Sequence, residues 1–525
     1  MKFLDILRIR LVLLPTFILL ITISSAAQDF LPLLSDNYSG INQAPLQPAA
    51  IVDSRFDRDF NLMGFNCDLY NTGMWFNSKW LRSPLSVLTN KGWWDKNTSL
   101  DKPNGQDEDF YMSQSIMGPS FLLSVGEKHA VGFTYRLRSI TNTDDLCEPL
   151  FRSVYQEYEN QSYWNTWYFD HQMRSVQHIF GDYALIYAAE IMNRGPHFMK
   201  IGGSLKFLQG IAAAYVQSDS LFFYYDDNSG PDGHSISWNS PYVRGGLSNN
   251  WGYYDNSDNF DYSINYQITD KPSVGFDIGL VYEYRPRFKQ YMYNVDGKRY
   301  KVRKDKTKYL FKVGLSILDV GRLKYNKLEN SFNMTVTSTE DYLRRFNDQD
   351  NSIPSNTYWM DVRKSSFSYL RYTEFVDTLY NRYLNGQGVE KDESDPGYFI
   401  MKLPTAVSFQ ADWKVYRSCF LNFTSFTALT QRFAENPNSH YISIYSLTAR
   451  YETKWVTVAV PVIYNQYKKI DFGLGIRTPF FYIGINNFLS SMFKDRHSLN
   501  IYFGAKLSVF QGKPRADVDN DIWAF

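Results

Sequence analysis

The stretch SVGEKHAVGFTYRLRS, residues 124–139, alternates between two kinds of side chain. Its odd positions carry Val131, Phe133, Tyr135 and Leu137, and its even positions carry Gly132, Thr134, Arg136 and Arg138. A period of two predicts a β-strand with one apolar face and one small or charged face. The apolar face must meet either a protein core or lipid, and the rest of the chain indicates which.

The same alternation recurs along most of the chain. It is present in 63–69, 183–190, 200–207, 274–284, 309–317 and 407–414, and candidate strands follow at 419–429, 441–451, 455–464, 469–478, 480–488 and 498–510. Each run is about 9–12 residues long, which suits a tilted strand that crosses a bilayer. Strands of soluble proteins usually end after about 5–6 residues. The apolar faces are therefore expected to meet lipid.

Connector lengths support a barrel. Short links at 126–129, 193–197, 415–418, 452–454 and around Pro479 alternate with long links at 73–117, 140–179, 210–271 and 319–402 and moderate ones at 430–439 and 489–497. The short link 465–468 and the segment 285–307 are exceptions, and Asp296-Gly297 in the latter predicts a small hairpin. We predict an all-β, transmembrane antiparallel β-barrel of about fourteen strands with long extracellular loops. A secreted sandwich or propeller also has alternating strands, but its strands are shorter.

The N-terminus predicts export. Lys2, Arg8 and Arg10 precede an apolar run at 11–23, and small residues at 25–27 suit cleavage after Ala27. A retained anchor is the alternative interpretation. We therefore divide the chain into a signal peptide (1–27), an N-terminal plug or hatch (28–58), an outer-membrane barrel (59–510) and a periplasmic C-terminal tail (511–525).

Composition excludes some classes of function. The formal net charge is +1, and removal of residues 1–27, with three basic residues and one acidic residue, brings it to −1. This balance gives no support for nucleic-acid binding. Three cysteines in an exported chain do not form a disulfide framework.

The predicted inward positions are rich in glycine, including Gly132, Gly202, Gly279 and Gly314. Glycine lets another backbone approach closely, so we expect the proline-containing segment before the first strand to fill the inner end of the lumen. A disordered tail is the alternative. TEDYLRRFND (339–348) and FVDTLYNRYLNG (375–386) predict short helices in a long extracellular loop.

Several charged residues fall on the predicted inner face. The lumen-facing candidates are Arg136, Arg138, Glu190, Asp277, Lys312, Asp412 and Arg477, together with Glu283 and Lys506. Such residues usually pair across a lumen or hold a plug. They can also line a permeation path or contact a polar head group.

Catalytic and metal-binding motifs are missing from the sequence. The seven histidines form no HExxH motif, and neither GxSxG in a strand-to-helix context nor a Walker A motif occurs. We predict no enzyme activity, metal or cofactor. Ser443 near His440 is the one pair that could suggest an outer-membrane lipid hydrolase, and a strand-end pair explains it more simply.

Five segments carry a family resemblance: PAAIVDS (48–54), SVGFDIGLVYEYRP (273–286), KVGLSILDVGRLKY (312–325), FIMKLPTAVSFQADWKV (399–415) and LNIYFGAKL (499–507). Their order resembles an uncharacterised group of Bacteroidota outer-membrane barrels, a domain of unknown function that is similar to FadL-type transporter barrels. The resemblance implies a fourteen-stranded barrel with an N-terminal segment in the lumen.

These observations predict a chain located in the outer membrane, surrounded by outer-membrane lipid. The leading hypothesis is passage or delivery of a small hydrophobic or amphipathic molecule. The alternative is a scaffold that does not transport and that docks a secretion or surface complex.

Overall fold

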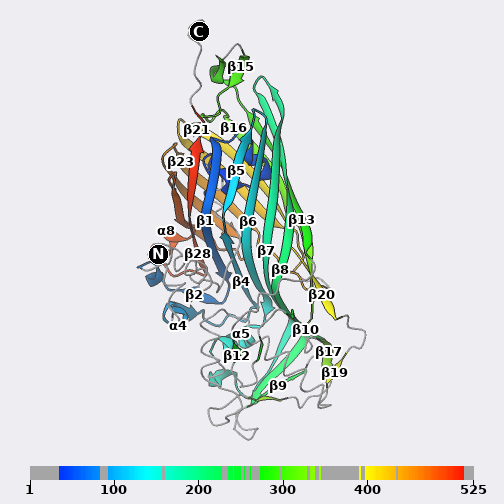
Figure 1. The fold of residues 1–525 in the computed structure, drawn as a ribbon. Coiled ribbons are helices and arrows are strands. Elements are labelled where there is room, and N and C mark those ends of the chain that lie inside the picture. Colours follow the sequence, from blue (N-terminus) through cyan, green and yellow to red (C-terminus); the bar gives the residue numbers. More distant parts are fainter. Residues whose placement is uncertain are drawn as a thin grey trace, which may run out of the picture.

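A ring of fourteen antiparallel strands forms the molecule (Figure 1). The computed structural model describes residues 33, 35–82, 93–156, 160–226, 235–239, 242–249, 253–254, 260–261, 272–295, 298–327, 332–336, 342–344, 389–391, 397–432 and 436–512. In ring order the strands are β1 (Phe56–Asn71), β4 (Glu108–Met117) continued by β5 (Ser120–Val125), β6 (His129–Leu146), β7 (Trp167–Arg194), β8 (His197–Asp226), β13 (Ser273–Tyr284), β16 (Phe311–Asn326), β21 (Ala406–Tyr416), β22 (Cys419–Ala428), β23 (Ile444–Glu452), β24 (Thr457–Asn465), β25 (Ile470–Phe472) continued by β26 (Leu474–Arg477), β27 (Phe481–Ile485) and β28 (Ser498–Phe510). The last strand, β28, pairs with β1 from Phe510 to Ser498, which closes the ring.

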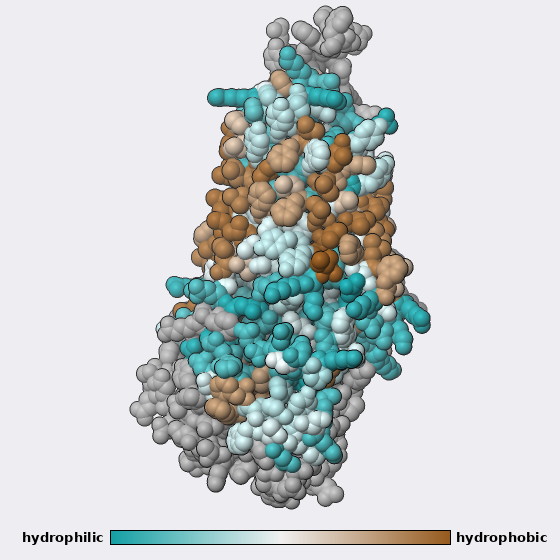
Figure 2. Space-filling view, turned by 180° about the vertical axis from the view of Figure 1, so that it is seen from behind, coloured by the Kyte–Doolittle hydropathy of each residue, from teal (hydrophilic) through white to brown (hydrophobic). Residues whose placement is uncertain are grey.

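The apolar face of each strand points out of the ring. In β23, Tyr445, Leu447 and Tyr451 are exposed, whereas Ser446 and Arg450 are buried. On the face that Figure 2 shows, the exposed apolar residues form a hydrophobic band with hydrophilic zones on both sides. Exposed apolar residues also occur around the ring, for example Phe60 on β1, Leu205 on β8 and Leu507 on β28. Such a band is the lipid-facing surface of a transmembrane barrel, so the predicted fold class is confirmed. No helix in the described part of the chain has the length and apolarity of a membrane span.

We call the end of the ring with the short turns the inner end and the opposite end the outer end. Several strands continue beyond the outer end, where long loops were expected. In particular, β7 has 28 residues and β8 has 30 residues. Their outer parts pair with each other, and β8 also pairs with β9 (Ser235–Asn239) and β10 (Tyr242–Leu247). The prediction of loops at 140–179 and 210–271 is therefore wrong in large part. The backbone hydrogen bonds between paired strands do not depend on contact with lipid, so the strands continue beyond the outer end.

Other connectors also contain strands. In the predicted loop 73–117, β4 already begins at Glu108. In the predicted loop 319–402, β16 continues to Asn326 and pairs there with β20 (Tyr398–Lys402). The helix predicted over 339–348 is wrong at β18 (Tyr342–Arg344), because the free edge of β9 pairs with it. The hairpin predicted within 285–307 is confirmed by β14 (Met292–Val295) and β15 (Lys298–Val302).

Some predictions fall on other parts of the chain. The signal peptide at 1–27, the helix at 375–386 and the C-terminal residues 513–525 lie outside the described residues. The loops do contain short helices: α4 (Trp93–Asn97) and α5 (Glu148–Tyr155).

The interior of the ring is filled. Residues 35–54, with the 3₁₀ helices η1 (Gly40–Gln43) and η2 (Pro48–Ile51), lie inside its inner half (Figure 1). The outer half contains a buried apolar cluster that includes Tyr70, Tyr111, Phe180, Tyr215, Tyr325 and Phe399. A layer of charged side chains lies between these two parts.

Candidate functional site

The charged layer joins β6, β7, β8, β13 and β16. It contains three cationic residues, Arg136, Arg138 and Lys206, and three acidic residues, Asp182, Asp277 and Asp319. All six are buried. Opposite charges in equal number explain how these groups are accommodated, since an unpaired charge in such a place is costly.

Asp319 is at the centre of the layer. Its carboxylate accepts two hydrogen bonds from Arg138, at 2.9 and 3.0 Å. It also accepts one from the Tyr441 hydroxyl at 2.6 Å, and it pairs with Lys206. The backbone at Asp319 has a positive φ of 56°, which accompanies a shift in register between β13 and β16. This bulge directs Leu323 and Tyr325 into the apolar cluster and Asp319 into the charged layer.

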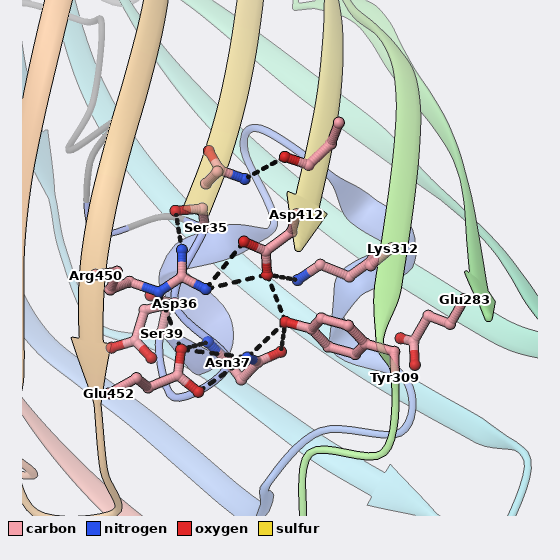
Figure 3. Close-up of polar contacts among 12 residues, drawn as sticks. Ser35, Asp36, Asn37, Ser39, Glu283, Tyr309, Lys312, Asp412, Arg450 and Glu452 are labelled. Carbon is pink, nitrogen blue, oxygen red and sulfur yellow. Dashed lines mark hydrogen bonds and ion pairs between the residues drawn. The ribbon is translucent and has the colours of Figure 1, made fainter. Parts of the chain in front are cut away.

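A second set of charges fixes the N-terminal segment to the wall (Figure 3). Arg450 Nη1 donates to Ser35 Oγ at 2.7 Å, and its Nη2 is 3.0 Å from Asp412 Oδ2. Asn37 Nδ2 donates to Glu452 Oε1 at 2.9 Å and to the hydroxyl of Tyr309 at 2.7 Å. We expected Tyr309 to face outward, but it precedes β16 and points inward.

Arg477 also anchors this segment, with its Nε 2.7 Å from Asp36 Oδ2. Burial alone would raise the pKa of Asp36, but the guanidinium groups of Arg477 and Arg450 outweigh it and bring the pKa to about 2. Asp36 is therefore ionised at neutral pH. At the other end of the segment, Asp53 pairs with Arg285 and Lys308, both at 2.7 Å.

The N-terminal segment has an apolar side as well. Ile41, Ala44, Ile51 and Val52 pack with inward residues of β4 to β7, among them Met117, Leu122, Ala184 and Ile186. On the neighbouring strand β8, a Cβ atom at Gly202 would lie 2.6 Å from the backbone nitrogen of Ala49. Polar contacts on one side and apolar packing on the other thus hold residues 35–54 in one position.

The sequence-predicted candidates divide into groups. Arg136, Arg138 and Asp277 come together in the charged layer. Lys312 lies 3.5 Å from Asp412. Among the other candidates, Arg477 contacts Asp36, Glu283 pairs with Arg285, and Lys506 donates to the Tyr38 carbonyl at 2.9 Å. Glu190 is only half-buried and lies in none of these groups.

Four participants were not among the candidates: Asp182, Lys206, Asp319 and Tyr441. Lys206 lies on the predicted inward face of the strand 200–207, and this position could have identified it as a lumen-facing charge. Asp182 directly precedes the predicted strand 183–190, at a position that continues its inward face. Asp319 follows 309–317, where a bulge changes which residues face inward. Tyr441 belongs to 437–443, which folds into the lumen between β22 and β23.

His440 in this segment has no catalytic arrangement with Ser443. Its Nε2 is 2.9 Å from Asp144 Oδ2, and its Nδ1 is 3.0 Å from the Tyr441 carbonyl. Ser443 Oγ instead accepts from the Ala428 backbone at 3.3 Å. Burial favours the neutral imidazole, but the Asp144 carboxylate prevails and raises the pKa of His440. In the described residues, no group of three or more His, Cys, Asp and Glu side chains could hold a metal ion.

Comparisons with known structures give neighbours over most of the chain. A FadL homologue of Pseudomonas aeruginosa is 9% identical, with 89% of this chain and 94% of that one covered and a TM-score of 0.37. A mutant of the monoaromatic hydrocarbon channel TodX is 9% identical, with 93% and 96% covered and a TM-score of 0.41. The Ralstonia pickettii toluene transporter TbuX is 8% identical, with 90% and 95% covered and a TM-score of 0.36.

No curated protein matches the chain. A family model does match it, over residues 48–486, and that family is described as a family of unknown function, DUF5723. The match covers most of the barrel and about the last third of the N-terminal segment. The chain therefore belongs to the DUF5723 family, as its resemblance predicted.

Proposed function

We propose that the protein passes or delivers a small hydrophobic or amphipathic molecule across the outer membrane. The observation that supports this proposal is the buried apolar cluster in the outer half of the lumen. A barrel that conducts polar solutes has a polar interior. An aromatic interior instead offers favourable contacts to an apolar molecule.

Phe399 illustrates this interior. Its ring centroid is 5.5 Å from that of Tyr325 and 5.1 Å from that of Tyr215. These contacts join β20, β16 and β8 across the outer lumen. A flat apolar molecule that replaced one ring would keep the same kind of packing.

We further propose that the expected segment 28–58, as far as it precedes β1 at Phe56, forms a plug that closes the inner end, following an exported signal peptide at 1–27. Ion pairs and side-chain hydrogen bonds hold 35–54, so its displacement would break no pairing between ring strands. The charged layer would then be a seal between the plug and the aromatic interior.

The test is flux into proteoliposomes that contain the full chain. A lipophilic fluorescent tracer should enter faster than it enters protein-free vesicles, whereas a small sugar should not. Phe399→Ser should slow the tracer, because it places a hydroxyl in the apolar lumen. Phe409→Ser, on the lipid face, is the matched control. Equal tracer entry with and without protein would contradict transport. Equal effects of Phe399→Ser and Phe409→Ser on tracer entry would show that the tracer does not pass through the aromatic cluster.

A docking scaffold is the second candidate. Beyond the membrane band, the outer parts of β7 and β8 expose Trp167, Phe169 and Phe222. The rings of Phe169 and Phe222 lie 4.6 Å apart. If this aromatic surface docks a surface protein, a photocrosslinking residue at position 222 should capture that protein in cells. A photocrosslinking residue at the lipid-facing position 207 should not. A chain that is recovered alone from both positions would count against the scaffold.

A further inference from the structure

The wall of the ring is interrupted at the outer end between β25 and β28. There β27 stops at Ile485, and the short helix α8 (Phe488–Phe493) takes the place of a longer strand. The Phe472 backbone N–H donates to Ser490 Oγ at 2.7 Å, which fixes the helix to β25. Asn487 Nδ2 donates to Ser498 Oγ at 3.3 Å, which fixes the start of the helix to β28. The helix is therefore part of the outer wall.

Strand register places α8 at the height of the outer membrane interface. The helix contacts β25, in which Ile470 pairs with Tyr464 of β24, and Tyr464 pairs with Tyr445 of β23. Both tyrosines are exposed, and their ring centroids are 6.4 Å apart. Tyrosines concentrate where a barrel surface passes from hydrocarbon to head groups.

The outward side of α8 is apolar. Phe493 is 85% exposed and Met492 is 57% exposed, whereas Ser490 and Ser491 are buried. At the height of the interface, water would surround both side chains unless acyl chains covered them. Placing them in hydrocarbon is favourable, because it removes their apolar surface from water.

Cationic residues surround this apolar tip. Lys494 follows α8 directly, and its Nζ lies 5.1 Å from the ring of Trp75. The ring of His497 lies 3.7 Å from that of Trp75, and Lys469 directly precedes β25, the strand that α8 contacts. Within the described part of the chain, no carboxylate lies within ion-pairing distance of either lysine.

The neighbouring 3₁₀ helix η3 (Ser78–Arg82) extends this charge. It contacts α8 and adds the exposed residues Lys79 and Arg82. The carboxylates of Asp495 and Asp101 lie nearby: Asp495 accepts the Ser78 backbone N–H at 2.8 Å, and Asp101 lies 2.7 Å from His497 Nε2. The four cationic residues therefore outnumber these two carboxylates. Positive charge beside an inserted apolar tip is the pattern that binds anionic lipids.

We propose that α8, with Lys469 and Lys494, binds a phosphate-bearing lipid of the outer leaflet. Phe493 and Met492 pack among its acyl chains, and the two ammonium groups contact its phosphate. The site lies on the outside of the wall, so it is independent of any molecule that passes through the lumen.

The test measures affinity of the full chain in detergent for fluorescent lipid A and for the same lipid without its phosphates. Loss of the phosphates should weaken binding about tenfold. The double variant Lys469→Ala/Lys494→Ala should lose the same factor for the phosphorylated probe and nothing for the other. The control is Lys454→Ala, because Lys454 lies near the exposed ring of Trp455 at the inner end, and it should change neither affinity.

Phe493→Ser separates the two parts of the site, since it should weaken both probes equally. Retention of heat-modifiable mobility on gels confirms that each variant is folded. Equal binding of the two probes by the wild-type chain would overturn the proposal. So would an equal loss in the Lys454 control, which would indicate non-specific attraction to any exposed lysine.

Discussion

Gly202 shows how closely the N-terminal segment approaches the barrel wall. A Cβ atom there would lie 2.6–2.7 Å from backbone atoms of Pro48 and Ala49, which cannot rotate away. We expect Gly202→Ala to destabilise the protein by about 1–3 kcal/mol. Hydrogen exchange in 40–54 should rise, as measured by mass spectrometry. The control is Gly203→Ala on the outward face, where the nearest atom is 3.2 Å away. Equal exchange in both variants would contradict this.

Asp319 is the charged residue whose loss should cost most. Asp319→Asn removes the carboxylate that pairs with Arg138 and Lys206 and leaves two buried cations short of a partner. Breaking such a network costs about 3–5 kcal/mol. Urea unfolding in lipid vesicles should show this loss. Glu190→Gln, at a half-buried position outside the charged layer, should change the free energy of unfolding by less than about 0.5 kcal/mol.

At the scale of elements, the segment 437–443 is held in the lumen partly by the pair of His440 with Asp144. Asn142 and Arg432 also face this pair. The folded state raises the pKa of His440 above its ordinary value of 6.5. The extra stability is therefore present below about pH 6.5 and lost as the pH rises through the folded-state pKa.

Hydrogen exchange in 437–443 should consequently increase between pH 6 and pH 9 beyond its intrinsic pH dependence. In His440→Gln this additional increase should be absent. His129→Gln, at an exposed position, should behave as the wild type. A wild-type segment without any additional increase would show that the pair does not hold it.

At the scale of the whole molecule, backbone pairing between neighbouring strands closes the ring without residues 33–54. We expect a chain that lacks them to form a heat-modifiable barrel with a lower melting temperature. Its inner lumen would fill with water and solvate the charges that 35–54 now cover. A heating series on gels should show that the folded band disappears at a lower temperature than that of the full chain. An unchanged temperature would contradict a plug held by these contacts.

Alternation along single strands predicted much of this architecture. A strand that crosses lipid must turn its apolar face outward. The local alternation of residues such as Val131, Phe133 and Leu447 therefore predicts the barrel. The outer extensions of β7 and β8 lie outside the lipid, so alternation of apolar residues does not predict them. Their partners are other strands outside the lipid, and only the fold brings these partners together.

The sequence by itself determined the barrel, its approximate number of strands, its family and the inward position of Arg136, Arg138 and Asp277. Only the tertiary structure decided which charges meet, because strands far apart in the chain supply them. Asp319 shows the reason: a bulge changes which side faces inward, and Tyr441 reaches it from a connector more than a hundred residues away. Periodicity is a property of one strand, whereas an ion pair across a lumen is a property of the closed ring.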